Sequence, residues 1–134
     1  MLLEEALDIL ACRVDTIGGL TVTTDPMAVV VVPMALVEED EVDFNESFGT
    51  GSLLTFRVTV FVSEADSRSG HTEARGYLST HGVTSVTAAL LAEVSGGDDL
   101  KRKVNVDIGR RESSDSYITA VFEGRAHVPG VVAT

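Results

Sequence analysis

The fold is decided by the stretch Leu54-Thr55-Phe56-Arg57-Val58-Thr59-Val60-Phe61-Val62, in which side chains of two kinds alternate. One face carries only apolar residues: Leu54, Phe56, Val58, Val60 and Val62. The other face carries Thr55, Arg57 and Thr59. A period of two residues is the signature of a strand with one buried face. The stretch therefore predicts a half-buried strand of a sheet.

Two further strands are predicted near the end of the chain. Apolar residues alternate with polar ones over Val104 to Ile108 and again over Ile118 to Val128. The polar segment from Arg110 to Asp115 is interpreted as the turn between them. The two strands should form an antiparallel hairpin.

The first part of the chain predicts a helix and two more strands. Apolar residues recur at helical spacing from Leu2 to Val14, and Gly18-Gly19 should end that helix. A short strand is predicted over Leu20 to Thr23. The continuously apolar run from Ala28 to Val32 favours a strand covered on both faces, ended by Pro33.

Two short helices are predicted between the central strand and the terminal hairpin. The first contains Ala74, Tyr77 and Leu78. For the second, Thr84 is the expected N-cap, and the expected buried stripe consists of Val86, Ala89, Leu90 and Val94. The segment Ser95-Gly96-Gly97 should end it. The element order predicts one α+β domain over residues 1–134, a small antiparallel or mixed sheet with helices packed on one face.

Composition places the protein in a reducing compartment. The chain has one cysteine, Cys12, so no intramolecular disulfide can form, and the most common role of such a residue is as a small core side chain. The first fourteen residues carry Glu4, Glu5 and Asp8, where a secretion signal needs positive charge. No apolar run approaches the ~20 residues of a membrane span. We expect a soluble protein with no membrane contact.

The charge is unevenly distributed along the chain. The formal net charge is −11; residues 1–56 hold eleven acidic residues and one basic residue, whereas residues 57–134 hold ten acidic and nine basic residues. An anionic surface repels phosphate, which disfavours nucleic-acid binding unless the bases between Lys101 and Arg111 gather into a patch. An acidic first half beside a base-containing second half would suit a head-to-tail contact between identical subunits, and a neighbour in a ring could cover the edges of a small sheet.

No constellation of catalytic residues can be assembled from the sequence. His71, His81 and His127 have no partner at metal-ligand spacing, and Asp98-Asp99 does not fit a calcium loop. We expect a protein that is not an enzyme and has no cofactor and no metal. A small enzyme or ligand-binding domain of the α+β class stays open as the alternative, and it would need a pocket with convergent polar groups.

Several segments, in their order along the chain, resemble one family. Phe44 to Gly51 leads into the strand Leu53 to Val62, and Ser63 to Ser69 follows. Next come Gly76-Tyr77-Leu78 and the helix Val83-Thr84-Ser85-Val86-Thr87-Ala88-Ala89-Leu90. This order is similar to that of tail terminator proteins of siphophages that infect actinobacteria: a strand, an Asp-Arg-Ser turn, Tyr-Leu, and a Ser-Ser-Val-x-Ala-Ala-Leu helix. Here the turn has an extra Ser67 and the cap reads Thr84-Ser85.

The resemblance implies a structural virion protein. Such a protein forms a hexameric ring that docks on the last ring of the major tail tube protein and stops its polymerisation. Its other face meets the head-completion or neck protein, and DNA passes through the channel without specific binding. The expected location is the head-proximal end of the tail, after synthesis in the host cytoplasm. A head-closure or other neck connector protein is the nearest alternative.

The candidate contact residues lie in three segments. Extended loops on a rigid sheet often carry binding, so we expect inter-ring or inter-subunit contacts in the acidic segment 38–48, in the loop from Ser63 to Gly70, and in the basic turn that begins at Arg110. The acidic segment should be a solvated loop or an edge, because six acidic residues lie between Glu38 and Glu46 with no base. The predicted contact residues are Glu38, Glu39, Asp40, Glu41, Asp43, Phe44, Phe48, Asp66, Arg68, Arg110 and Arg111.

Overall fold

Five strands form one mixed sheet with three helices packed on it, which confirms the predicted α+β class. The computed structural model describes residues 3–43, 52–64, 68–82, 84–94, 97–101 and 103–128. The helices are α1 (Leu3–Val14), α2 (Arg68–Leu78) and α3 (Val86–Leu91). The strands are β1 (Thr21–Thr23), β2 (Met34–Asp43), β3 (Ser52–Glu64), β4 (Val104–Ser113) and β5 (Tyr117–Val128). Among the described residues, no helix is long and apolar enough to cross a membrane.

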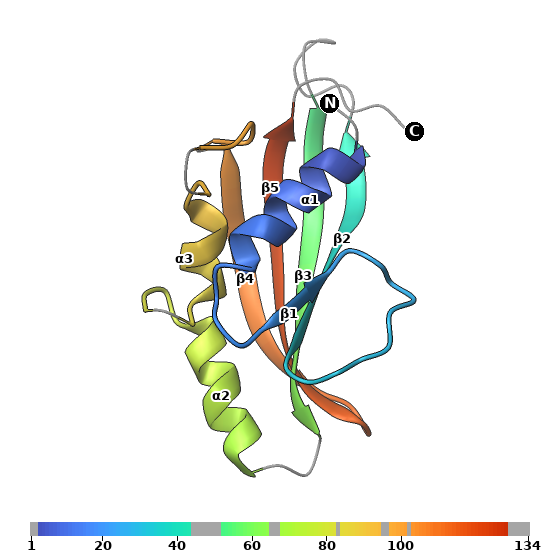
Figure 1. Ribbon diagram of the computed structural model, residues 1–134, viewed down its shortest axis with the longest axis vertical. Helices are drawn as coiled ribbons and strands as arrows, with labels where there is room; N and C mark the ends of the chain where they lie inside the picture. Colours follow the sequence, from blue (N-terminus) through green and yellow to red (C-terminus); the bar gives the residue numbers. More distant parts are fainter. Residues whose placement is uncertain are drawn as a thin grey trace.

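The strand order across the sheet is β1-β2-β3-β5-β4. β1 runs parallel to β2, and every other neighbouring pair is antiparallel. The helices lie on one face of the sheet, with α1 crossing over its middle strands and α2 and α3 lying toward β4 (Figure 1). β1 and β4 are therefore the edge strands, and no helix or strand of the described residues covers the face opposite the helices, which we call the bare face.

The core lies between the helices and the strand that the alternating sequence predicted. All five apolar residues of that face, from Leu54 to Val62, are buried in β3. Phe56 pairs with Gly124 of β5. A side chain at Gly124 would lie 2.7 Å from the Cζ atom of Phe56 and closer still to the carbonyl oxygen of Asn105, so only glycine fits at this position without displacing its neighbours.

The largest departure from the sequence-based prediction concerns the first half of the chain. Ala28 to Val32 does not form a buried strand: it lies in the connection between β1 and β2, and Val29 is 83% exposed. The strand comes later, and its second half, from Glu38 to Asp43, is the segment predicted to be a loop or an edge. The loop alternative is wrong and the edge alternative holds, because this segment pairs with β3 on one side and has no described strand on the other. Pairing with β3 satisfies its backbone, Val42 packs against the core, and the acidic side chains stay exposed or half-buried.

The predicted basic turn is also wrong in its bounds. Arg110 to Ser113 belong to β4, and only residues 114–116 form the turn to β5. The hydroxyl of Ser114 accepts hydrogen bonds from the backbone N–H groups of Ser116 and Tyr117, which closes the turn within three residues. The predicted loop from Ser63 to Gly70 is shorter as well, because Ser63 and Glu64 end β3 and Arg68 begins α2.

Three further details differ from expectation. The N-cap of α3 is Ser85 rather than Thr84, because the Ser85 hydroxyl accepts the backbone N–H of Ala88 at 3.1 Å. This helix ends at Leu91, before Val94 and the predicted terminator Ser95-Gly96-Gly97. Cys12 is exposed on α1 and is not a core residue.

A buried ion pair joins α1 to the segment that precedes β4. The side chain of Arg13 is fully buried, and its Nε and Nη2 atoms donate to the two carboxylate oxygens of Asp98 at 2.9 and 2.5 Å. The Nη1 atom donates to the carbonyl oxygen of Leu90 at 2.8 Å, and Nη2 also donates to that of Lys101 at 2.6 Å. A bidentate pair with further carbonyl acceptors is the arrangement in which a buried guanidinium is well compensated.

The carboxylate of Asp98 is equally well satisfied. It accepts hydrogen bonds from the backbone N–H groups of Val94, Leu100 and Lys101, at 3.2, 3.1 and 2.9 Å. The hydrogen bonds from Arg13, together with those from the backbone, lower the pKa of Asp98 to about 2. Asp98 is therefore charged in the folded protein at every pH at which the protein is commonly handled.

Replacing Asp98 with asparagine should destabilise the fold strongly. The substitution leaves a buried guanidinium without its counter-charge, so we expect the free energy of unfolding at pH 7 to fall by about 3 kcal/mol or more, measured by urea unfolding. Asp99→Asn is the matched control, because Asp99 is exposed and its neutralisation should change little.

The pH dependence gives this prediction a sign. Because the pKa of Asp98 is lower in the folded chain than the ~3.9 of an unfolded aspartate, the contribution to stability is complete above about pH 4 and is lost as the pH falls toward 2. The stability difference between wild type and Asp98→Asn should shrink over that interval. A difference that stays constant from pH 6 to pH 2 would contradict the assignment.

Candidate interaction surfaces

Each of the two edges of the sheet includes a stretch of strand that has no neighbouring strand within the described residues. β1 pairs with Met34, Ala35 and Leu36 of β2, so the rest of β2 has no strand beside it on that side within the described residues. β4 pairs with β5 on one side and has no described strand on the other. Unpaired strand edges bind other strands readily, so these two edges are candidate contact surfaces.

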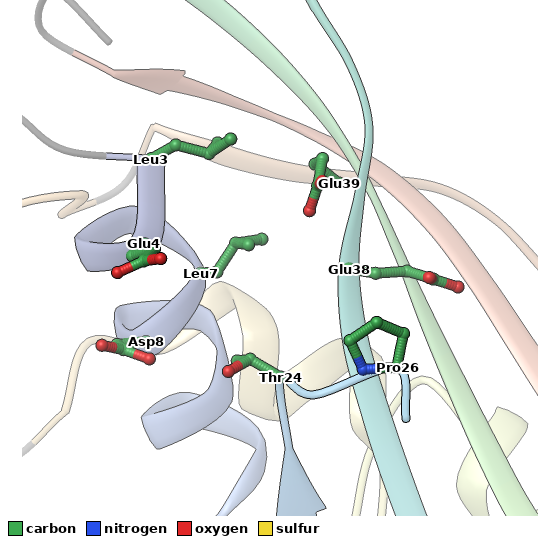
Figure 2. A pocket seen from close by; sticks show the side chains of 8 residues that line it. All are labelled: Leu3, Glu4, Leu7, Asp8, Thr24, Pro26, Glu38 and Glu39. Atoms are coloured by element: carbon green, nitrogen blue, oxygen red, sulfur yellow. The ribbon is translucent and has the colours of Figure 1, made fainter. Parts of the chain in front are cut away.

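An acidic groove lies along the open part of β2. It has a volume of about 490 Å³ and is formed by α1, the segment after β1, and β2. Figure 2 shows the eight residues that line it: Leu3, Glu4, Leu7, Asp8, Thr24, Pro26, Glu38 and Glu39. Four of these are carboxylates, and two leucines from α1 provide an apolar wall. We call this surface the β2 groove.

Neighbouring acids of β2 point to opposite faces of the sheet. Glu39 is paired with Phe56, whose side chain is buried under the helices, whereas Glu38 is paired with Arg57 on the bare face. Figure 2 agrees, since Glu39 extends from β2 toward α1 and Glu38 extends away from it. Glu39 therefore faces α1 across the groove, on the helix-covered face.

The opposite edge carries bases. Arg111 of β4 is exposed and is paired with Ala120, a core residue, so it lies on the helix-covered face. Arg110 is paired with Val121 and lies on the bare face. Its Nε atom lies 2.7 Å from Glu112, and its Nη1 atom lies 3.2 Å from Glu123.

The ion pairs of Arg110 belong to a row of charges across the bare face. Glu123 lies between Arg110 and Arg57. The Nη2 atom of Arg57 is 3.2 Å from the Glu123 carboxylate. Hydrogen bonds from Arg110, and then from Arg57, lower the pKa of Glu123. Hydrogen bonds to Glu112 and Glu123 raise the pKa of Arg110. Since these side chains are partly solvated, the row orders the surface more than it stabilises the fold.

The predicted contact residues fall on different parts of the molecule. Glu38, Glu39, Asp40, Glu41 and Asp43 lie together on β2, and Arg110 and Arg111 lie on β4. The sheet order separates these two groups, so the structure does not bring them together within one chain. Arg68 begins α2, and its side chain is not described. Phe44, Phe48 and Asp66 lie outside the described residues.

The connection from β1 to β2 carries an exposed apolar surface that the sequence analysis did not predict. Met27, Val29 and Val31 are 86%, 83% and 64% exposed in a connection that projects beside β2 (Figure 1). We call Met27–Val31 the apolar loop. The only signal in the sequence was the run of apolar residues itself, which favours burial and was interpreted as a core strand. Large exposed apolar residues next to one another mark contact sites in soluble proteins.

The residues considered for chemistry stay apart. Among the described residues, no group of three or more His, Cys, Asp or Glu side chains could hold a metal ion. His71 lies on α2, and His81 and His127 are exposed on a loop and on β5. Asp98 is engaged by Arg13.

Comparisons with known proteins give no family for this chain. Its sequence matches no model of a known protein family, and no characterised protein resembles it closely enough to count as a relative.

The apolar loop should contribute little to the stability of the folded chain. Replacing Met27, Val29 and Val31 together with serine should leave the free energy of unfolding within about 0.5 kcal/mol of wild type, because exposed side chains lose few contacts. It should also reduce binding of a dye that fluoresces on apolar surface. Val60→Ser is the control, since the same change at a buried position should destabilise the protein. Equal destabilisation of both variants would show that the loop packs against the domain.

Proposed function

We propose that this protein is a structural subunit of a long-tailed bacteriophage: the tail terminator, which caps the tail tube, stops its polymerisation and joins the tail to the neck. In this proposal the protein works as a ring of identical subunits, and it is not an enzyme. Its partners are the major tail tube protein on one side and a head-completion or neck protein on the other.

The observation that carries the proposal is the exposed apolar loop. Met27, Val29 and Val31 present large apolar side chains to water, and a chain that functions alone would gain solubility from polar residues at these positions. Their exposure is explained if another protein surface covers them. The apolar loop therefore supports the class of assembly subunit.

The order of the sequence motifs supports the particular assembly. The strand, Tyr-Leu and capped-helix parts of the pattern lie here on β3, α2 and α3, whereas Asp66 and Ser67 of the turn lie outside the described residues. Within that pattern, Ser85 caps α3, and Val86 and Leu90 are buried on its inner side. The matching segments are thus parts of a packed structure rather than isolated likenesses.

The charge of the protein suits a channel through which DNA passes. With a net charge of −11, a subunit repels the phosphate backbone. A duplex could then slide through a ring of such subunits without being held, because few phosphates would be neutralised.

Two measurements test the proposal. Light scattering should show a ring, either for the protein alone or after it meets tail tubes, and electron microscopy should show it at one end of tubes that no longer grow. The apolar-loop variant with serine at positions 27, 29 and 31 should stay folded but lose the cap, because its contact surface is gone. Val29→Leu, which keeps the surface apolar, is the matched control and should still cap.

Other outcomes would change the assignment. A protein that ignores tubes but binds isolated heads or neck complexes is the connector of the alternative reading. A monomer that binds neither tubes nor heads at any concentration overturns the proposal.

A further inference from the structure

We propose that the subunits join by strand addition, with β4 of one copy pairing with the open part of β2 of the next copy and Arg111 entering the β2 groove. This inference rests on the proposed function in one respect: it takes the partner to be a second copy in a ring. It adds to that function the two surfaces that meet and the charges that align them.

The backbone of both edges is available. β1 ends at Thr23 after covering Met34 to Leu36, and Thr24 and Pro26 after it line the groove near Glu38, so an added strand would pair with β2 beyond them, from Glu39 to Val42. β4 offers a strand of ten residues, Val104–Ser113, with a free outer side in the described structure. Pairing the two would satisfy the unpaired N–H and C=O groups of both edges.

The side chains of the two edges match in sign and in face. On the helix-covered face, Arg111 of β4 would meet Glu39 of β2. Glu4 and Asp8 also line the groove, but Figure 2 shows that they extend from α1 away from β2, so Glu39 is the carboxylate that the arginine meets. Leu3 and Leu7, which extend toward β2, would pack against the aliphatic stem of the arginine while its guanidinium reaches Glu39.

The residues next along the two strands are also complementary. In the antiparallel register that sets Arg111 opposite Glu39, Arg110 lies opposite Asp40 and Ile108 lies opposite Val42. The same register sets Glu38 opposite Glu112, a carboxylate that Arg110 of its own chain pairs with at 2.7 Å. Because the side-chain period of a strand is two, a slip by one residue would remove the match between Arg111 and Glu39.

Strand direction agrees with a ring. β2, β3, β5 and β4 alternate in direction, so β4 runs opposite to β2. When like-oriented copies stand side by side around an axis along the strands, β4 of one copy meets β2 of the next in antiparallel orientation. This is the pairing with favourable hydrogen-bond geometry, and the contact is head-to-tail, as a closed ring requires.

The acidic edge does not fit a second copy of itself. Two β2 edges would place carboxylates against carboxylates. The exposed apolar residues are also divided between the two sides: Leu91 and Ile108 lie on α3 and β4, whereas Met27, Val29 and Val31 lie beside β2. The heterologous contact therefore buries apolar surface from both partners.

Charge reversal tests this pairing. Arg111→Glu and Glu39→Arg should each weaken ring formation, alone or at the tube end, by about tenfold or more, since like charges would then face each other. The double variant Arg111→Glu/Glu39→Arg restores opposite charges at every interface of the ring and should assemble again. Arg75→Glu and Glu73→Arg on the exposed side of α2 make the same charge changes and should assemble normally. Light scattering and the fraction of capped tubes are the readouts, with urea unfolding to confirm that each variant is folded.

Each outcome decides the matter. Rescue by the double variant supports the pairing of these two edges. If wild type forms rings or caps and the single variants do so equally well, or if the folded double variant stays unassembled, the strand pairing is overturned while the proposed function stands. If wild type forms neither rings nor caps, the proposed function and the pairing both fail.

Discussion

The arrangement of the domain depends on the buried pair of Arg13 and Asp98. Arg13 ends the inner side of α1, and its guanidinium is held by Asp98 and by two carbonyl groups that lie near the end of α3 and just before β4. A buried charge that must keep its partner fixes geometry more strictly than apolar contact does, because a small displacement costs hydrogen bonds to an ion. The pair thus fixes where α1 crosses the sheet.

The position of α1 determines the candidate contact surface. Glu4, Leu7 and Asp8 of α1 form one wall of the β2 groove, so the groove depends on how α1 is positioned relative to β2. The ion pair lies at the other end of the same helix, toward β4. One interaction therefore connects the two edges of the sheet that the proposed ring brings together, although neither Arg13 nor Asp98 belongs to either edge.

The sequence predicted those parts of the fold in which a local pattern coincides with burial. β3 and β5 alternate over most of their length, α1 has a clear apolar stripe, and all three were placed within two residues of their observed ends. The ion pair escaped prediction because 85 residues separate its members, and no local pattern joins them. A weak signal existed, since Arg13 follows Leu10 by three residues and so occupies a position of the apolar stripe, where a charge requires a partner.

The two errors in the first half of the chain share a physical origin. Sequence patterns report which residues are suited to burial, and they do not say whether the burying surface belongs to the same chain. Ala28 to Val32 is apolar enough for a core strand yet is half-buried or exposed, while the acidic end of β2 is polar enough for a loop yet forms a strand with an open side. Both segments lie on one side of the sheet, next to the groove. In an assembly that covers this side, the apolar run would be buried and the acidic strand would be paired, as the proposed contact between copies requires.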